Sequence, residues 1–332
     1  MNEIRGRVKG GLIGIAYGDA FGMPSEMWTP DRIKETFGKI DSFLPGHPDN
    51  VISSKLVRGE VTDDTINSVL VVEMLGENSG NVDPHLFIRK LKQWIAGSAK
   101  SAAVVGPSTA KAIALMEEGV PMEETGKMGT TNGGAMKILP IGLKAGSRDG
   151  EIDDDRLIEE VVKLCLPTHY TSCAIGAATA IAAGGAAAVG GYKTVEEIYE
   201  YMMRMAERGM GYGNPVGGPS IAKRMELGRY FADNYPEEQA LKMIYDYVGT
   251  GLPSTESVPA AAALFYMAKG NPVLCARYAA NIGGDTDTMG AMACGICGAY
   301  SKTRHFAEEE IEMLETVNGI SFERLTDLLL ST

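Results

Sequence analysis

The stretch RGRVKGGLIGIAYGDAFG, residues 5–22, has a glycine at every fourth position from Gly10 to Gly22. Residues four apart in an α-helix lie on one face. The helix predicted over residues 5–20 therefore carries a bare stripe formed by Gly10, Gly14 and Gly18 and continued by Gly22. A face without side chains lets a second backbone approach closely, so the stretch predicts tight helix packing near the N-terminus.

Helical periodicity continues beyond this stretch, and almost no segment alternates between apolar and polar residues as a half-buried strand does. The sequence therefore predicts an all-α fold. Further helices are predicted at residues 62–76, 84–96, 107–118, 155–165, 171–189, 194–208, 219–232, 237–248, 256–269, 271–280, 286–300, 307–314 and 321–330. The breaks between them are turn-rich but short, and none resembles an interdomain linker. We predict a single compact domain spanning residues 1–332.

The composition is typical of a well-buried globular protein. Of the 332 residues, 45% are hydrophobic and 22% are charged, and the formal net charge is −12. An acidic chain is not attracted to phosphate backbones or anionic lipids, so neither a nucleic acid nor a membrane is expected as a partner. The Ala- and Gly-rich segment 174–190 has too few large apolar side chains to partition into lipid. We interpret this segment as a buried helix.

The N-terminus and the cysteines predict a cytoplasmic protein. Residues 1–11 are basic but lack the apolar stretch of a secretory signal. The five cysteines are an odd number at scattered spacing, which indicates reduced thiols in the interior. Cys294 and Cys297 have the spacing of a redox pair or of half a zinc site, but they fall within the helix predicted at 286–300 and no second pair accompanies them. We expect these two thiols to pack, without redox or metal chemistry.

Two clusters of Asp and Thr are the strongest candidates for a functional site. Thr62-Asp63-Asp64-Thr65 begins one apolar helix, and Asp285-Thr286-Asp287-Thr288 begins another helix of small and apolar residues. One such cluster alone is explained by capping, because Thr is an acceptable N-cap and acidic residues in the first turn favour the helix dipole. Two buried helices that both begin with paired carboxylates indicate a shared site.

The two clusters together predict a cation site. If the helix starts meet, Asp63, Asp64, Asp285 and Asp287 bring four negative charges together, and protons or cations must offset their repulsion and desolvation. Two divalent cations carry the matching charge. All candidate ligand atoms are carboxylate or hydroxyl oxygens, which suit Mg²⁺, Mn²⁺ or Ca²⁺ better than Zn²⁺.

Other sites that use the same residue types fit less well. An EF-hand beginning at Asp285 needs an oxygen ligand at its fifth position and Glu at its twelfth, where the chain has Met289 and Ile296. A phosphatase of the Asp-x-Asp type needs a strand before Asp285, whereas residues 274–282 look helical. The sequence contains neither a P-loop pattern nor a Gly-x-Ser-x-Gly elbow. Nucleoside triphosphate hydrolysis and serine hydrolysis are therefore poorly supported.

His169 differs from the other three histidines in its surroundings. It lies in the polar segment 167–172, next to the helix predicted at 171–189. A polar cluster beside a buried helix indicates the wall of a site. A lone histidine of this kind is nevertheless more often a capping or otherwise satisfied residue, and both interpretations stay open.

With these motifs in order, the chain resembles the ADP-ribosylglycohydrolase family, which includes ADP-ribosylarginine hydrolases and dinitrogenase-reductase-activating glycohydrolases. The resemblance covers nearly the whole chain. It rests on five motifs, namely Gly14-Ile15-Ala16-Tyr17-Gly18-Asp19-Ala20-Phe21-Gly22 followed by Glu26, then Thr62-Asp63-Asp64-Thr65, Asn132-Gly133-Gly134-Ala135-Met136 with Pro140 and Gly142, Thr168-His169, and Gly283-Gly284-Asp285-Thr286-Asp287-Thr288. It implies an all-α orthogonal multi-helix domain with two Mg²⁺ or Mn²⁺ ions in a central cleft. The implied reaction is hydrolysis of an N- or O-glycosidic bond at the anomeric carbon of a ribose.

The resemblance also implies roles for individual residues. The metal ligands would be Thr62, Asp63, Asp64, Asp285, Asp287 and Thr288. Glu26 would be a mobile acidic residue that completes the site, and the candidates for the catalytic base are Glu26, Asp63 and Asp285. The candidate substrate contacts are Gly129, Asn132, Gly133, Gly134, Ala135, Met136, His169, Tyr212, Gly283 and Gly284. Backbone amides of residues 129–135 are expected to hold phosphates.

Two features bear on the substrate. Lys137 stands where the family often has Arg, and an ammonium cannot make the two-pronged contact of a guanidinium. The segment 211–220, which contains Tyr212, does not match the ADP-ribosylarginine hydrolases; Tyr212 either faces a base or packs.

We expect an enzyme that removes ADP-ribose from a modified protein or a small conjugate. The alternatives are a hydrolase of a smaller ribosyl compound such as a nucleoside, and a non-catalytic ADP-ribose-binding protein. The complete set of four Asp and two Thr ligands argues against the non-catalytic alternative, because a binding protein has no need of two metal ions.

Overall fold

The computed structural model describes residues 2–97, 105–148 and 150–331. Within these ranges the chain forms 17 α-helices, two 3₁₀ turns and one π-helical turn, and it contains no β-strand. The predicted all-α class is therefore confirmed. One hydrophobic cluster includes side chains from Val8 near the N-terminus to Leu329 near the C-terminus.

The helix bounds are as follows. The helices that form or flank the site are α1 (Asn2–Gly22), α3 (Asp63–Glu77), α8 (Leu139–Ser147), α10 (Ser172–Val189), α14 (Ser254–Met267), α15 (Pro272–Ile282) and α16 (Thr286–Ser301), with the short turns η1 (Met23–Ser25), η2 (Asn132–Gly134) and η3 (Ile244–Val248). The other helices are α2 (Pro30–Phe37), α4 (Pro84–Gly97), α6 (Pro107–Glu117), α7 (Met122–Thr125), α9 (Asp154–Cys165), α11 (Val195–Gly209), α12 (Ile221–Asn234), α13 (Glu237–Met243), α17 (Glu308–Asn318) and α18 (Phe322–Leu330).

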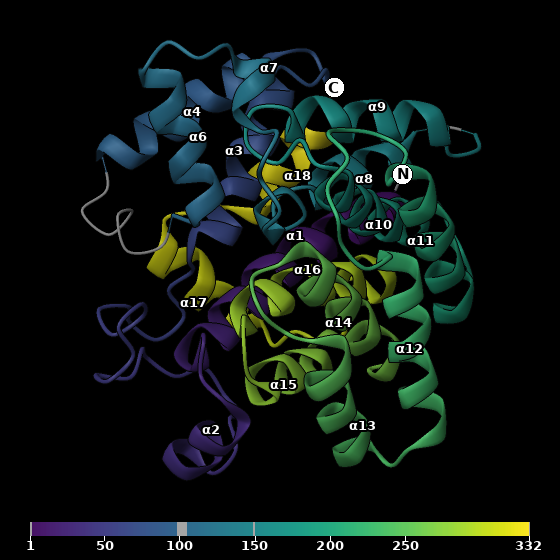
Figure 1. The fold of residues 1–332 in the computed structure, drawn as a ribbon. Helices are drawn as coiled ribbons and strands as arrows, with labels where there is room; N and C mark the ends of the chain where they lie inside the picture. The colour runs from purple at the N-terminus through teal and green to yellow at the C-terminus, as the bar shows by residue number, and fades with distance from the viewer. Residues whose placement is uncertain (1, 98–104, 149, 332) are drawn as a thin grey trace.

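The glycine stripe of α1 packs along α16, and the two helices lie at the centre of the molecule (Figure 1). A Cβ atom at Gly14 would lie 2.1 Å from the carbonyl oxygen of Cys294, and one at Gly18 would lie 2.0 Å from that of Gly290. Both distances are far below any real Cβ contact, so only glycine permits this approach. The predicted tight packing is confirmed, and α16 is the partner.

Helix α10 lies in the interior, where every residue from Cys173 to Val189 is buried. Its length and apolar composition also satisfy the criteria for a membrane span, but the whole 18-residue window is buried inside the protein. The interpretation of segment 174–190 as a buried helix is confirmed.

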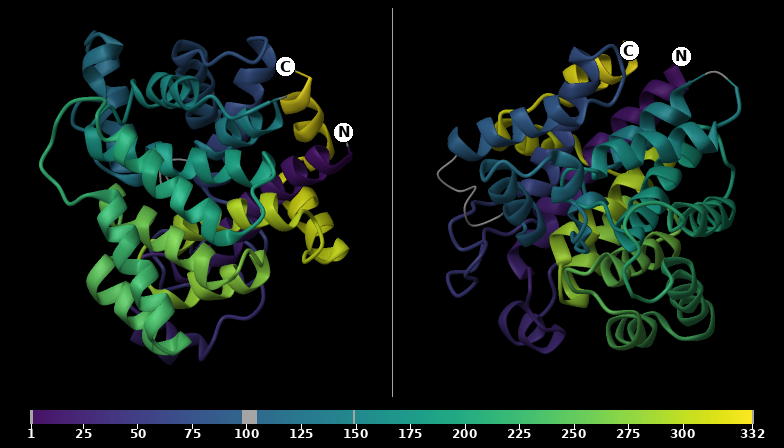
Figure 2. Two further views of the ribbon diagram at one scale, coloured as in Figure 1. Left: turned by 90° about the vertical axis from the view of Figure 1, so that its right-hand side faces the viewer. Right: turned by 45° about the horizontal axis from the view of Figure 1, so that its top comes forward.

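The two ends of the chain lie on the same side of the molecule in both views of Figure 2. Arg5 of α1 pairs with Asp327 of α18 at 2.6 Å. The last helix is thereby attached to the first, near the N-terminal end of α1.

The sequence analysis predicts no helix at the positions of α2, α7 and α8. Helix α8 is buried from Leu139 to Gly146, so no polar face marks its periodicity. Helix α7 is a single turn, too short for a periodic signal. The helix predicted at 237–248 is divided between α13 and the π-helical turn η3.

Candidate metal centre

The N-terminal ends of α3 and α16 meet, as the two Asp/Thr clusters predict. The Thr288 hydroxyl of α16 donates a hydrogen bond of 3.3 Å to Oδ2 of Asp64. The Thr62 hydroxyl, at the N-cap of α3, donates to the same oxygen at 3.2 Å. One carboxylate oxygen of Asp64 therefore joins both helix starts.

Glu26 is brought to this junction by the backbone that follows η1. Met27 N–H donates to the carbonyl of Gly284 at 2.7 Å, and Gly284 N–H donates to the carbonyl of Trp28 at 2.9 Å. Oxygens of Glu26, Asp285 and Asp287 lie within 4.8 Å of one another. We call the five carboxylates at this junction, Glu26, Asp63, Asp64, Asp285 and Asp287, the acidic centre.

Gly283 and Gly284 shape the turn that begins α16. Their φ angles are +86° and +82°, a region that L side chains rarely adopt. A Cβ atom at Gly284 would also lie 2.3 Å from the carbonyl oxygen of Thr250, which accepts a hydrogen bond of 2.7 Å from Asp285 N–H. In this structure the two glycines allow the backbone conformation that orients Asp285.

Burial is the main cause that raises the pKa of each carboxyl in the acidic centre. At Asp63, burial and the neighbouring carboxylates raise the pKa to about 8. The pKa values of Glu26, Asp64 and Asp287 lie well above the usual range, because each group is removed from water and faces other carboxylates. The charge of Lys137 offsets part of this rise at Asp63.

Three carboxylate oxygens of the acidic centre are buried without a hydrogen-bond partner. They are Oε2 of Glu26, Oδ1 of Asp64 and Oδ1 of Asp287. Buried polar atoms are normally satisfied, so each of these three requires an explanation. The donor set consists of carboxylate and hydroxyl oxygens, which fits hard divalent cations. The cluster as observed thus has the charge, the free lone pairs and the donor chemistry of a cation site.

The glycine turn, residues 131–134, is connected directly to the acidic centre by Asn132. The Asn132 side chain donates hydrogen bonds to the carboxylate of Asp285 and, at 3.0 Å, to the hydroxyl of Ser257. Its backbone N–H donates to the carbonyl of Leu252 at 2.9 Å. Sequence analysis names Asn132 as a substrate contact; the structure places its amide as a support for Asp285.

His169 lies behind the glycine turn and has no exposed surface. Its Nδ1 is 2.8 Å from the Thr168 hydroxyl, and its Nε2 is 3.1 Å from the Thr131 hydroxyl. A Cβ atom at Gly133 would lie 2.8 Å from the imidazole ring, so the ring packs against the turn from the protein side. Burial, and secondly the charge of Lys137, hold the pKa of His169 well below its usual range. Of the two interpretations, the geometry favours the satisfied residue.

Lys137 is a second residue that supports the turn from inside. It is buried, and its ammonium donates to the Gly133 carbonyl at 2.8 Å and to the Thr168 hydroxyl at 3.3 Å. Burial lowers its pKa to about 8, although the nearby Asp63 favours the charged form. Sequence analysis noted Lys137 only for its difference from Arg. A charged residue inside a strongly apolar segment, 135–143, was the available signal.

The remaining candidate substrate contacts divide into buried and exposed positions. Gly129, Gly134, Ala135 and Met136 are buried. Tyr212 is 41% exposed and lies in the loop between α11 and α12. The Asn214 side chain of that loop donates to the Lys127 carbonyl at 2.7 Å, which places the loop beside the segment that leads into the glycine turn.

Asp19 was not identified as a site residue by sequence analysis, although it lies in the stretch that carries the glycine stripe. It is fully buried and accepts hydrogen bonds from the first turn of α3. A charged residue in a helix face that must be buried was the signal that could have indicated it.

The Cys-x-x-Cys pair lies in the middle of α16, and both thiols are buried and free. The Cys294 thiol donates to the Pro272 carbonyl of α15 at 3.4 Å. Cys275 of α15 lies close enough for both thiols to influence its pKa, a neighbour that sequence spacing did not reveal. Among the described residues, the group suited to hold a metal ion is that of Glu26, Asp285 and Asp287 rather than these thiols.

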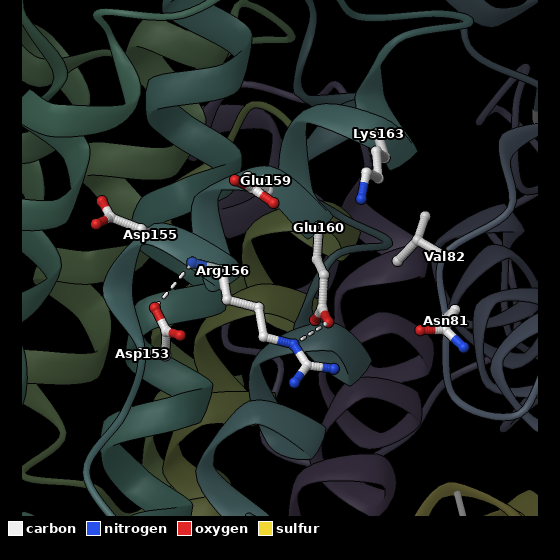
Figure 3. Close-up of a pocket in the computed structure, with 8 residues that line it drawn as sticks. All are labelled: Asn81, Val82, Asp153, Asp155, Arg156, Glu159, Glu160 and Lys163. Atoms are coloured by element: carbon white, nitrogen blue, oxygen red, sulfur yellow. Dashed lines mark hydrogen bonds and ion pairs between the residues drawn. The ribbon is translucent and has the colours of Figure 1, made fainter.

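A surface hollow of about 550 Å³ lies on α9 and contains none of the predicted site residues (Figure 3). It is lined by Asn81, Val82, Asp153, Asp155, Arg156, Glu159, Glu160 and Lys163. The Arg156 side chain pairs with Glu160 at 3.1 Å, and its backbone N–H donates to the N-cap Asp153 at 3.0 Å. These polar groups of the hollow therefore bond one another, and the acidic centre remains the candidate site.

Comparisons with known proteins relate the chain and its all-α fold to one family. The model of the family described as ADP-ribosylglycohydrolase matches residues 1–332. The chain is 35% identical to "Uncharacterized protein YegU" of Escherichia coli K12 over 97% of this chain and 96% of that protein. It is 30% identical to an "Uncharacterized protein" of Archaeoglobus fulgidus, covering 90% and 88% of the two chains. A solved structure titled "ADP-ribosylglycohydrolase-related protein complex" superposes with a TM-score of 0.73 at 22% identity, over 99% of this chain and 98% of the other.

Proposed function

Because the chain belongs to the ADP-ribosylglycohydrolase family, we propose that it is a metal-dependent hydrolase of the glycosidic bond at the anomeric ribose carbon of ADP-ribosylated substrates. The observation that carries the proposal is the group of three unpartnered, buried carboxylate oxygens in the acidic centre. Such oxygens keep free lone pairs in a buried position. The substrate is an ADP-ribosylated protein or a small ADP-ribosyl conjugate.

The proposed ligands for two divalent cations, Mg²⁺ or Mn²⁺, come from the two helix starts. They are Thr62, Asp63, Asp64, Asp285, Asp287 and Thr288. When bound, such cations would neutralise the carboxylates, orient a ribose diol and acidify water. The Thr62 and Thr288 hydroxyls already converge on Asp64, so the ligand set is supported by contacts between side chains.

Among the three candidate bases, the structure favours Glu26. One oxygen of Asp285 accepts the Asn132 amide, and only 8% of the Asp63 surface is exposed. Glu26 is half-buried, and its Oε2 has no partner. The residue thus reaches the edge of the site, while its buried Oε2 retains a lone pair for a proton.

The reaction that follows is a hydrolysis in which the chain moves one proton. The Glu26 carboxylate takes a proton from water while the water oxygen forms a bond to the anomeric carbon. The bond from that carbon to the leaving nitrogen or oxygen breaks, its electron pair stays on the leaving atom, and Glu26 gives that atom the proton it took from water. Asn132 holds Asp285 in place during these steps, because it bonds both that carboxylate and Ser257.

The glycine turn is the proposed phosphate contact. The turn lies next to the acidic centre through Asn132, and glycine-rich turns present N–H groups to anions. The N–H groups of Gly129, Asn132 and Ala135 already donate to backbone carbonyls, so the proposed contacts are the amides of Gly133 and Gly134. Lys137 and His169 support the turn from behind. All five cysteines are free thiols, as expected in a reducing compartment, and the proposal places the enzyme in the cytoplasm.

The test measures product release from a defined panel. Purified protein with Mg²⁺ or Mn²⁺ is incubated with ADP-ribosylarginine, ADP-ribosylserine protein, a small ADP-ribosyl conjugate and a nucleoside, and released ADP-ribose or free base is quantified by chromatography. The proposal expects ADP-ribose release that stops in EDTA and in Asp287→Asn. Glu160→Gln, a buried carboxylate on α9 away from the centre, is the matched control and should remain active.

The alternatives give different results in the same assay. Release of base from the nucleoside without release of ADP-ribose would indicate a hydrolase of smaller ribosyl compounds. No turnover of any substrate, together with a thermal shift by ADP-ribose that ribose does not produce, would indicate a binding protein. Either result would overturn the proposal.

A further inference from the structure

Asp19 makes a set of contacts that no other carboxylate of the site makes. Its two oxygens accept hydrogen bonds from Thr62 N–H at 3.0 and 3.1 Å, from Thr65 N–H at 3.0 Å and from the Thr65 hydroxyl at 2.5 Å. The residue is fully buried. We propose that Asp19 is a positioning residue that holds the first turn of α3, and with it Asp63 and Asp64, in the geometry that binds the cations. This inference rests on the proposed metal-dependent function.

Asp19 binds the two backbone N–H groups that a capping box would hydrogen-bond at the start of a helix. In a capping box, a residue at the third helical position bonds the N-cap N–H, while the N-cap side chain bonds the N–H of that third residue. In α3 these groups are Thr62 N–H and Thr65 N–H. One carboxylate from α1 binds both of them, and the Thr62 hydroxyl instead accepts the Asp64 N–H at 3.4 Å and donates to the Asp64 carboxylate at 3.2 Å.

Asp19 is itself not a cation ligand. Three donors bind its two oxygens, with Thr62 N–H shared between them, and neither oxygen is among the unpartnered buried oxygens, which belong to Glu26, Asp64 and Asp287 within the acidic centre. A carboxylate whose two oxygens both accept protein donors holds those donors in place, and it lacks the unpartnered oxygen that Glu26, Asp64 and Asp287 each have.

The position of Asp19 along α1 is itself restricted by its glycine neighbours. A Cβ atom at Gly18 would lie 2.0 Å from the Gly290 carbonyl, and one at Gly22 would lie 2.4 Å from that of Thr286. The Thr286 hydroxyl also donates to the Gly22 carbonyl at 2.8 Å. Helix α1 therefore contacts the beginning of α16 through its glycines and the beginning of α3 through Asp19, and it sets the relation between the two.

The test is Mn²⁺ affinity, measured by electron paramagnetic resonance of free Mn²⁺ with the full-length protein. In Asp19→Asn, an NH₂ group takes the place of one carboxylate oxygen. This group cannot accept a hydrogen bond and would face the N–H donors of Thr62 and Thr65. Groups that orient metal ligands typically change affinity by ~10–100-fold, and a loss in this range is expected. Glu160→Gln, another buried carboxylate with hydrogen-bonded partners, should reduce thermal stability without changing Mn²⁺ affinity.

A second pair of variants keeps the proposal testable if Asp19→Asn does not fold. Thr65→Ser keeps the hydroxyl that bonds Asp19, and Thr65→Val removes it. We expect Mn²⁺ affinity close to wild type for Thr65→Ser and several-fold weaker for Thr65→Val. Equal affinities in these two variants, or a folded Asp19→Asn with wild-type affinity, would overturn the positioning role. Because Mn²⁺ is the probe, a failure to hydrolyse ADP-ribosyl substrates would not affect this result.

Discussion

Replacement of Gly14 by Ala should destabilise the protein through the contact of α1 with α16. The new Cβ atom would lie 2.1 Å from the carbonyl oxygen of Cys294, about 1.3 Å short of the ordinary van der Waals range that begins at 3.4 Å. The obstacle is backbone, which cannot rotate away as a side chain does. Overpacking of this kind costs ~1–3 kcal/mol, and more in rigid surroundings. We expect about 3 kcal/mol, partly offset by the higher helix propensity of Ala, which is worth ~1 kcal/mol.

Gly6→Ala is the matched control within the same helix. A Cβ atom at Gly6 would lie 3.6 Å from the nearest heavy atom, Cδ of Lys302, which is ordinary contact. This variant should be neutral or more stable by up to ~1 kcal/mol. The two variants should therefore differ by about 2–3 kcal/mol.

The assay is urea unfolding, in which a lower midpoint at unchanged slope reports lost stability. Gly14→Ala should also weaken Mn²⁺ binding, because separating α1 from α16 moves Glu26 relative to Asp287. A Gly14→Ala protein as stable as Gly6→Ala would refute the reasoning, since the backbones would then be free to separate without cost.

Three further predictions concern the acidic centre and the thiols. Asp287→Asn should reduce turnover by at least ~100-fold with an unchanged circular dichroism spectrum; wild-type turnover at limiting Mg²⁺ would contradict its role as a ligand. In EDTA, the melting temperature should fall as pH rises from about 4 toward 8. The folded state keeps a proton on Asp63, whose pKa is raised to about 8, where the unfolded chain has lost it; Mg²⁺ should remove this dependence, and a melting temperature that rises with pH in EDTA would be the opposite result. Replacement of Cys294 and Cys297 together by Ala should cost about 1 kcal/mol per site through lost packing and leave hydrolysis intact, with no zinc found by metal analysis of the wild-type protein; stoichiometric zinc lost in the double variant would contradict this.

The sequence by itself determined the features that depend on local interactions. Helical periodicity identified most of the helices, because apolar spacing and capping are properties of neighbouring residues. The glycine stripe predicted close packing, and the two Asp/Thr clusters predicted a common site, since paired carboxylates at two buried helix starts require a shared explanation. The hydroxyl of Thr288 on Asp64 confirms that meeting.

Only the tertiary structure decided which groups face the acidic centre and which support it. Asn132 bonds Asp285 from 153 residues away, His169 is buried behind Gly133, and Asp19 caps a helix that begins more than 40 residues later. No local pattern contains these relations. The role of each of these side chains depends on the partners that folding places around it. Those partners lie on helices far apart in the sequence, and the order of the helices along the chain does not show which of them are in contact.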